Sequence, residues 1–294
     1  MKYEDLPSRE KPAKTAQSLF AGIRNADTRE PEQATTWTVS ASVLVAALQR
    51  HTDDQGVPLL RIKGGAYLEW AFHPAARATQ DVDAFFTAGA TEFDEFLRRA
   101  LTEPMGDFSF IIKQRSSEIP VKTAAFKPRR HEIQVLFARK LLRKVVLEVS
   151  FSEGHMARMV GSVEAPRLEP FGVPTPTEAF ASISPEYQVA QKLHACTGPG
   201  SADRERDVLD ILLLKRNVFD AAGTSAALAT ACADIFSTRA AFAAQNDLAA
   251  TIWPTEIVQN MAWGKDYGRL AGLLGVETGL APAIAEINAW SSQI

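Results

Sequence analysis

This chain of 294 residues has few cysteines, no long apolar run and no excess of basic residues. Its two cysteines, Cys196 and Cys232, are too few for a disulfide framework or a cysteine-rich zinc site. The five histidines show no ligand spacing, which argues against a histidine metal centre. No apolar run could span a bilayer, and the first residues lack the hydrophobic stretch of a signal peptide. We therefore expect a cytoplasmic protein.

Charge restricts how the chain could bind nucleic acid. With 32 basic and 35 acidic residues the net charge is −3, so any contact with RNA must be local. Two basic clusters are candidates, Lys122, Lys127, Arg129 and Arg130, and then Arg139, Lys140, Arg143 and Lys144. They flank residues 132–137, which alternate as a strand does, and so we expect both near the rim of the sheet. The alternative is an edge hairpin that lysine and arginine protect from aggregation.

Proline and apolar residues divide the chain into two parts. The predicted strands alternate with helices up to about residue 165, which is typical of an α/β domain. Four prolines, Pro166, Pro170, Pro174 and Pro176, then indicate a connector over residues 164–185. An alanine- and leucine-rich sequence follows. We predict an α/β domain over residues 1–165, with an N-terminal helical segment, and an α-helical domain over 166–294. Residues before about 33 are polar and are expected to cover the surface.

The first candidate for chemistry is a glycine pair. Leu60 and Ile62 lie in a short apolar run that ends at Gly64-Gly65, and a short helix is predicted over residues 66–72. Without a Cβ, glycine lets backbone N–H groups approach a phosphate, and the following helix N-terminus adds partial positive charge. The alternative is an ordinary tight turn.

A carboxylate pair follows this unit. Asp81 and Asp83 are two apart in a predicted strand, so their side chains share a face, while Val82 and Ala84 belong in a core. Two such acids repel each other unless a cation neutralises them, and Mg²⁺ would join them to a nucleoside triphosphate. The alternative is a pair of solvated loop carboxylates.

Glu148 is a candidate third acid. In residues 145–151 the apolar side chains alternate, which leaves Glu148 on the opposite face beside Ser150. Three carboxylates can hold two Mg²⁺ ions about 3.5–4 Å apart, as polymerase-like sites do. The alternative is a strand with a solvent-facing glutamate.

Two predicted helices in the second half carry a lysine and two acids. Ser184-Pro185 is typical of a capped helix start, and Gln188 and Lys192 then share one helix face. Lys192 could reach a triphosphate as a point charge. After a glycine-containing turn, Asp207 and Asp210 lie on one face of the next helix, so Lys192 and Asp210 should face each other. A purely structural Lys–Asp pair is the alternative.

These motifs together resemble a known family. Ordered along the chain they are Lys63-Gly64-Gly65, Arg77-x-Thr79-x-Asp81-x-Asp83, Gln191-Lys192-Leu193-His194-Ala195, Arg204-x-Arg206-Asp207-x-x-Asp210 and, more weakly, Phe236-x-x-Arg239. Over residues 59–214 this order resembles the AbiEii/AbiGii toxin family of nucleotidyltransferases, especially its MenT branch.

The resemblance implies a fold, an activity and residue roles. The fold would be a polymerase-β-like minimal nucleotidyltransferase core with an α-helical C-terminal domain. The protein would be the toxin of a toxin–antitoxin pair, adding nucleotides, with pyrimidines favoured, to the 3′ end of tRNA, so that translation stops. Its partner would be a winged-helix antitoxin. Implied metal ligands are Asp81, Asp83 and Glu148; implied nucleotide-binding residues are Lys63, Gly64, Gly65, Thr79, Lys192 and Arg239; Lys192 and Asp210 would be catalytic, with Arg77 and Asp207 secondary.

Two departures from the family pattern stand out. Ala66 occupies a position where relatives often have Ser or Thr, and Thr79 stands where they often have Ser. A first alternative activity is nucleotidyl transfer to a protein or to a small molecule such as an aminoglycoside. A second is a non-catalytic protein that binds a nucleotide or an antitoxin.

Overall fold

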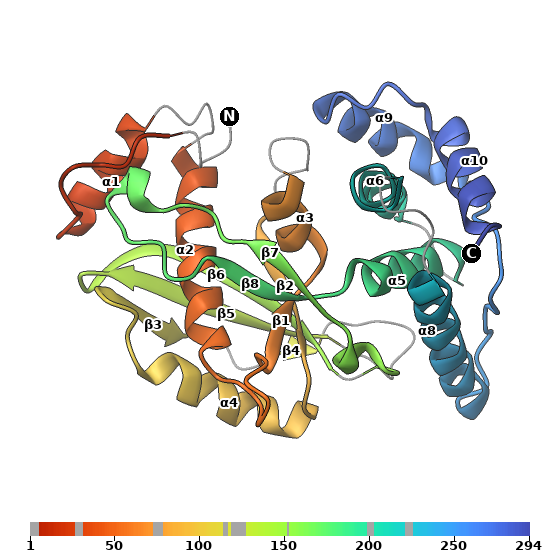
Figure 1. The fold of residues 1–294 in the computed structure, drawn as a ribbon, viewed down its shortest axis with the longest axis horizontal. Coiled ribbons are helices and arrows are strands. Elements are labelled where there is room, and N and C mark those ends of the chain that lie inside the picture. Colours follow the sequence, from red (N-terminus) through yellow and green to blue (C-terminus); the bar gives the residue numbers. More distant parts are fainter. Residues whose placement is uncertain are drawn as a thin grey trace.

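A computed structural model describes residues 6–26, 32–72, 79–113, 117–118, 128–151, 153–198, 203–220 and 226–294. Arg77, Lys122 and Lys127 lie outside these residues. The strands gather on one side of the molecule and the later helices on the other (Figure 1). The predicted α/β part followed by a helical part is therefore confirmed.

A mixed sheet forms the first part. Its strands are β1 (Leu60–Ile62), β2 (Asp81–Phe86), β3 (Phe108–Ile112), β4 (Ser117–Glu118), β5 (Arg129–Phe137), β6 (Lys140–Ser150), β7 (Val160–Glu164) and β8 (Ala179–Ile183). Their order is β3-β5-β6-β2-β1-β8-β7, with β4 beside β5. β2 runs parallel to β6 and β1 parallel to β8, and the other pairs are antiparallel. The strand with the acid pair thus lies at the middle of the sheet.

Helices cover this sheet. Figure 1 shows α2 (Glu32–Gln49) crossing it, and α2 packs against β1, β6 and β8. The others are α1 (Ala16–Asn25), α3 (Gly64–Phe72) and α4 (Ala90–Thr102), with 3₁₀ turns at Met156–Arg158 and Glu169–Phe171. Leu19 and Ile23 of α1 are buried, so the expectation that residues before 33 cover the surface is wrong for this helix. Its apolar residues repeat with helical spacing among polar ones, which hides them in composition alone.

The predicted connector over residues 164–185 contains a strand of the sheet. β8 pairs with β7 over five residues and lies beside β1, so describing the whole stretch as a connector is wrong. The four prolines all precede β8, and side chains such as Phe180 are buried there because α2 packs on β8 and Trp70 of α3 lies against Phe180. We propose that the helical part begins at Pro185 rather than at residue 166.

The helical part consists of α5 (Pro185–Thr197), α6 (Glu205–Leu214), α8 (Ala226–Gln245), α9 (Gly264–Leu273) and α10 (Leu280–Ser291). A π-helical turn, Lys215–Phe219, extends α6, and a 3₁₀ turn, Met261–Trp263, precedes α9. α5 packs against α6 and α8. Ser184 occupies the predicted cap position, but its hydroxyl makes no capping bond, so that detail of the prediction is wrong. In the described part of the chain, no helix is both long and apolar enough to cross a membrane.

Candidate active site

The glycine pair forms a tight turn between β1 and α3. The backbone N–H of Lys63 donates to the Asp83 carbonyl oxygen at 2.9 Å, which ties the turn to β2. Gly64 has a φ of +59°, and a Cβ there would collide with the Asp83 carboxylate, so only glycine fits. The Gly64 N–H donates to Gln188 Oε1, and the Gly65 N–H to Asp83 Oδ2, each at 3.2 Å. Both N–H groups are therefore directed at acceptors.

Strand register places charged residues in a row across the sheet. On β2 and β6, Asp83 lies opposite Glu148, and on β5 and β6, Glu148 lies opposite Arg130. Val145, Leu147 and Val149 are buried on the other face, as the alternation predicts. Arg130 donates to the Glu148 carboxylate, from Nε at 2.8 Å and also from Nη2. Glu148 thus lies next to Asp83 in the sheet, with its charge paired to Arg130.

Thr79 fixes the first acid of the pair. Its hydroxyl donates to Asp81 Oδ1 at 3.0 Å, and its backbone N–H donates to Glu69 Oε2 at 2.6 Å. Glu69 belongs to α3, so this bond connects the helix after the glycine turn to the start of β2. The hydroxyl that Thr79 shares with the Ser of relatives thus orients a carboxylate here; its predicted nucleotide contact stays a prediction.

Asp83 is in an unfavourable electrostatic position. Burial and the neighbouring Asp81 raise its pKa to about 6, although Lys63 and the bond from Gly65 act in the opposite direction. Burial lowers the pKa of Lys63, even though Asp83 favours its charged form. The acid pair is therefore short of positive charge.

This charge deficit fits a divalent cation. Asp81 and Asp83 are hard oxygen ligands on one strand face, the kind that Mg²⁺ prefers. Within the described ranges, no group of three or more His, Cys, Asp or Glu side chains is gathered closely enough to share a metal ion. The Glu148 carboxylate is instead bonded to Arg130. Glu148 as the third ligand stays a prediction.

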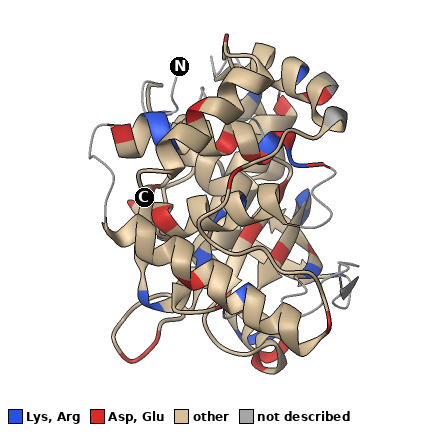
Figure 2. Cartoon of the chain, turned by 90° about the vertical axis from the view of Figure 1, so that its right-hand side faces the viewer, with Lys and Arg blue, Asp and Glu red and all other residues tan. Residues whose placement is uncertain are grey.

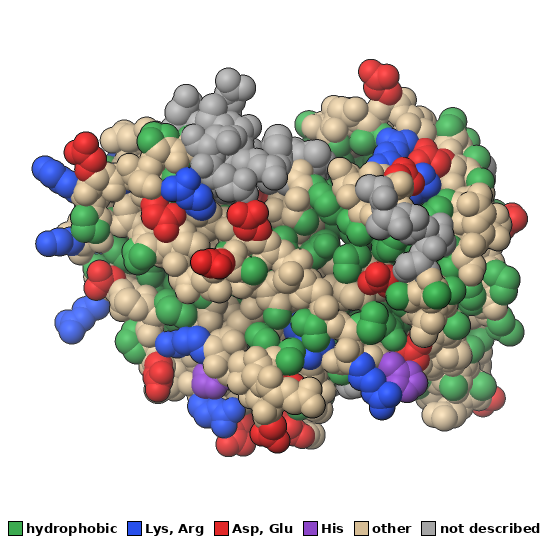
Figure 3. Space-filling model, in the orientation of Figure 1, with side chains coloured by type: hydrophobic (Ala, Val, Ile, Leu, Met, Phe, Trp, Pro, Cys, Tyr) green, Lys and Arg blue, Asp and Glu red, His purple; other side chains and the backbone are tan. Residues whose placement is uncertain are grey.

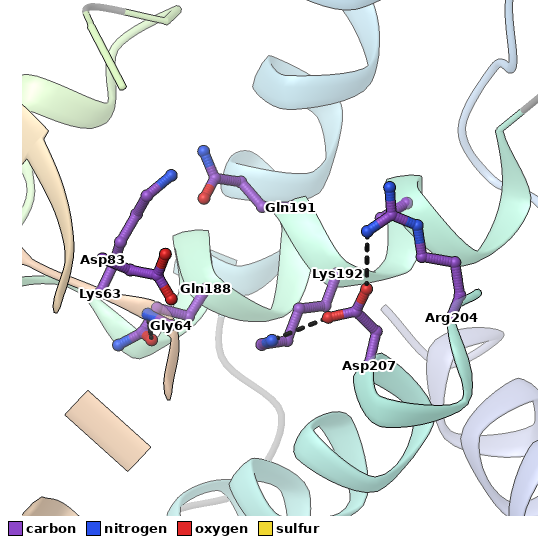
Figure 4. Close-up of a pocket in the computed structure, with 9 residues that line it drawn as sticks. Lys63, Gly64, Asp83, Gln188, Gln191, Lys192, Arg204 and Asp207 are labelled. Carbon is purple, nitrogen blue, oxygen red and sulfur yellow. Dashed lines mark hydrogen bonds and ion pairs between the residues drawn. The ribbon is translucent and has the colours of Figure 1, made fainter. Parts of the chain in front are cut away.

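A cavity of about 250 Å³ opens beside the glycine turn. Figure 4 shows it between the turn and helix α5. It is lined by Lys63, Gly64, Asp83, Gln188, Gln191, Lys192, Ala195, Arg204 and Asp207. The structure therefore brings the first-half and second-half motifs to one site, as the sequence predicts.

The helical wall of this cavity is built from ion pairs. Lys192 Nζ lies 2.9 Å from Asp207 Oδ1 and 2.8 Å from Asp210 Oδ2, and Arg204 also contacts Asp207 at 3.3 Å. Burial disfavours the charged lysine, but the two aspartates outweigh it and raise the pKa of Lys192. Lys192 and Asp210 thus face each other as predicted.

A second cavity, of about 170 Å³, adjoins the first. The two share Lys63, Asp83 and Gln191, and the second adds Pro128, Glu148, Ser150, Glu153 and Arg239. The Arg239 guanidinium bonds to Glu153, and its Nη1 lies 3.0 Å from His194 Nδ1. Burial acts to raise the pKa of Glu153, but the Arg239 guanidinium has the stronger opposite effect, so the pKa is lowered overall. Arg239 therefore lies with Glu148 rather than at the glycine turn.

Sequence reasoning missed Glu153 and assigned no role to Gln188 or Gln191. Glu153 continues the alternation of Val149, which is buried, and Phe151, which is half-buried, so an acid at an apolar position was the available signal. Gln191 Nε2 donates to Glu153 Oε2 at 3.0 Å. These residues connect α5 to the end of β6.

The two basic clusters lie at different ends of the sheet. Arg130 is next to Glu148, whereas Arg129 contacts Asp94 at 3.5 Å and the Ala90 carbonyl at 2.8 Å. Lys140 begins β6, so it lies about 25 Å from Glu148 at the rise of an extended strand. Lys144 of the same cluster is about 13 Å from Glu148 by the same rise and pairs with Glu132. Basic and acidic residues are interspersed on the face that Figure 3 shows and over the helical part in Figure 2.

A sheet that presents a glycine turn and paired aspartates to a helical lysine–aspartate motif is that of a nucleotidyltransferase. The family model described as "Nucleotidyl transferase AbiEii toxin, Type IV TA system" matches residues 46–287, so this chain belongs to the AbiEii nucleotidyltransferase toxin family. The resemblance that the motifs indicated is confirmed.

Two solved structures are similar at low identity. The nucleotidyltransferase toxin MenT4 from Mycobacterium tuberculosis H37Rv is 15% identical, with 94% of each chain covered and a TM-score of 0.43. ANT(2″)-Ia in complex with adenylyl-2″-tobramycin is 16% identical, with 72% of this chain and 99% of that chain covered and a TM-score of 0.34. No curated protein sequence matches the chain.

Proposed function

We propose that this toxin transfers NMP from an NTP, with pyrimidines favoured, to the 3′-hydroxyl of tRNA in a Mg²⁺-dependent reaction that stops translation. The observation that carries the proposal is the position of Asp83, which accepts the Gly65 N–H and lines one cavity together with Gly64, while Asp81 lies two residues before it on the same strand. Such a site can bind a cation and a polyphosphate together.

The first cavity would hold the NTP. Phosphate oxygens are stronger acceptors than an amide oxygen, so one of them would replace Gln188 Oε1 as the acceptor from the Gly64 N–H. Lys63 and Lys192 also line this cavity and would add positive charge. Two of the three Lys192 protons face Asp207 and Asp210, which leaves one donor for the substrate.

The second cavity would receive the acceptor hydroxyl. Because both cavities share Lys63, Asp83 and Gln191, the α-phosphate would lie at this common wall. The hydroxyl oxygen attacks the α-phosphorus, the bond to the bridging oxygen breaks, and pyrophosphate leaves on the side of the glycine turn. The hydroxyl proton passes to Glu148 or to solvent. A divalent cation held by Asp81 and Asp83 supplies charge neutralisation at the reacting phosphate when it is bound.

Arg130 is the described basic residue best placed to meet RNA. It is half exposed and neighbours Glu148, so it lies where an acceptor strand must pass. With a net charge of −3, the protein needs such a local cation near its acids.

Incubation with each labelled NTP and total tRNA tests this function. We expect label in tRNA, most with CTP or UTP, and none with Asp81→Asn. Sequencing of the RNA 3′ ends then identifies the added base and the acceptor. Label in protein or in an aminoglycoside, with none in RNA, would replace the proposed acceptor. NTP binding without any transfer would show a nucleotide binder.

Membership of a toxin family implies a cognate antitoxin. We propose that this partner is a winged-helix protein encoded next to the toxin. Its co-expression should restore growth of cells that express the toxin. Unchanged growth arrest would reject this partner.

A further inference from the structure

Gln188 has an unusual position in the cavity wall. It lies on α5 with 2% of its surface exposed, and it lines the cavity beside Lys63, Gly64 and Asp83. Its Oε1 accepts the Gly64 N–H at 3.2 Å. Because that bond needs an acceptor, it fixes which end of the amide is oxygen and which is nitrogen.

The Gln188 nitrogen is left without a partner. Nε2 is fully buried and makes no hydrogen bond to any part of the chain that the structure describes. Buried amide donors are almost always satisfied, because leaving one unpaired is costly. An unpaired donor in the wall of a binding cavity therefore points to a ligand.

The neighbouring polar side chains of α5 already have partners. Lys192 is paired with Asp207 and Asp210, and the Gln191 amide bonds to Glu153. Gln188 differs from both because its Nε2 has no partner in the described part of the chain, although the residue lines the cavity next to Gly64 (Figure 4).

We propose that Gln188 binds the polyphosphate of the donor nucleotide, with Nε2 donating to a phosphate oxygen next to the glycine turn. The inference rests on the proposed function, since it takes the first cavity as the NTP site. Gln188 also connects the helical part to the turn, because its Oε1 holds Gly64 before the nucleotide arrives. Polyphosphate binding would then depend on α5 as well as on the sheet.

Two substitutions test this contact. Gln188→Met keeps the length of the side chain but removes donor and acceptor, and Gln188→Glu keeps an acceptor but replaces the donor with a negative charge. Binding of a non-hydrolysable NTP and of inorganic triphosphate is measured by calorimetry on the whole protein. We expect Gln188→Met to raise both Kd values about tenfold or more, as loss of a hydrogen bond to a charged group does, and Gln188→Glu to raise them further.

Gln49→Met is the matched control. Both ends of the Gln49 amide bond to the backbone of Ala181, away from the cavity, so this change should leave NTP binding unaltered. Thermal melts show whether each variant is folded. In the transfer assay, Gln188→Met should raise the KM for NTP much more than it lowers kcat.

Wild-type Kd values for a folded Gln188→Met or Gln188→Glu protein would overturn the inference. So would weaker NTP binding with unchanged triphosphate binding, since the contact would then not involve phosphate. These results are separate from the test of function. Wild-type protein that binds NTP but labels no RNA would reject the proposed reaction and leave the Gln188 contact standing.

Discussion

The two walls of the cleft differ in how their charges are balanced. On the sheet wall, Asp81 and Asp83 lie together, and the pKa of Asp83 rises to about 6 because of burial and its neighbour. On the helical wall, Lys192 bridges Asp207 and Asp210, and Arg239 pairs with Glu153. There, burial acts to raise the pKa of Asp207, but Lys192 has the stronger opposite effect, so the pKa is lowered overall.

This difference separates two tasks. The helical wall is electrostatically complete, so it can hold its shape before any ligand binds. On the sheet wall, Lys63 does not offset the effects of burial and of Asp81 on Asp83, so this wall is completed by what it binds. Perturbed acids of this kind are typical of functional sites, whereas matched pairs are also common in purely structural networks.

Removal of one sheet-wall acid should have the largest effect. Asp81→Asn or Asp83→Asn should lower transfer at least about a thousandfold, equivalent to about 4 kcal/mol, because a cation loses a ligand. Initial rates with labelled NTP measure this. Asp266→Asn, at an exposed residue of α9, is the control and should retain full activity. Comparable activity in both proteins would contradict the metal-binding role.

Breaking the helical wall should mainly affect folding. Lys192→Met removes the cation that Asp207 and Asp210 share and leaves Asp207 only its contact with Arg204, so the free energy of unfolding at pH 7.5 should fall by about 3–5 kcal/mol. Urea denaturation measures it. Lys144→Met removes an exposed partner of Glu132 and should cost about 0–1 kcal/mol.

The pH dependence of that loss follows from Asp207. Since Lys192 lowers the pKa of Asp207, the stability this pair contributes is present above the unfolded value of 3.8 and is lost as pH falls through the folded pKa. The gap between wild type and Lys192→Met should therefore shrink toward pH 3. An equal gap at both pH values would show that packing, not charge, is lost.

On the sheet wall, removing charge should stabilise the metal-free protein. Asp83 has a folded pKa of about 6 against an unfolded value of 3.8, so its ionisation destabilises the fold increasingly as pH rises through this window. Asp83→Asn should gain roughly 3 kcal/mol at pH 7.5 and nothing below pH 3.5. Urea denaturation in EDTA measures the gain. Mg²⁺ should then stabilise wild type but not this variant. If the Asp83→Asn protein were less stable than wild type at pH 7.5, the sheet wall would not be short of positive charge.

The Arg130–Glu148 pair should give the smallest effect. It is a half-exposed pair, so Arg130→Gln should change stability by less than about 1 kcal/mol. We expect it to raise the KM for tRNA severalfold and to leave the KM for NTP unchanged, because Arg130 lies on the acceptor side. Arg139→Gln, at the far end of the sheet, should change neither value. Equal effects of both variants would indicate bulk attraction rather than a local contact.

Local patterns predicted the parts of the site that lie within single elements. Strand alternation placed Asp83 and Glu148 on the face opposite the core, and helical spacing placed Lys192 toward Asp210. These periods follow from backbone geometry alone. The order of the motifs then indicated the family.

Contacts between residues far apart in the chain could not be predicted from local sequence patterns. Arg130 becomes the partner of Glu148 through the register of β5 and β6, and Glu153 meets Arg239 across 86 positions of chain. Neither contact has a local pattern. β8 was missed because its strand is short and follows a proline-rich stretch, and its place beside β1 depends on sheet topology.

The position of β8 has a consequence for anyone who would build hybrids of this enzyme. β8 lies between β1 and β7 in the sheet, and a single residue, Ser184, separates it from α5. A helical half taken from residue 166 onward would carry away one of the sheet's inner strands, whereas one taken from Pro185 would leave the sheet whole. Exchange of helical halves between relatives should therefore succeed only with the junction at Ser184.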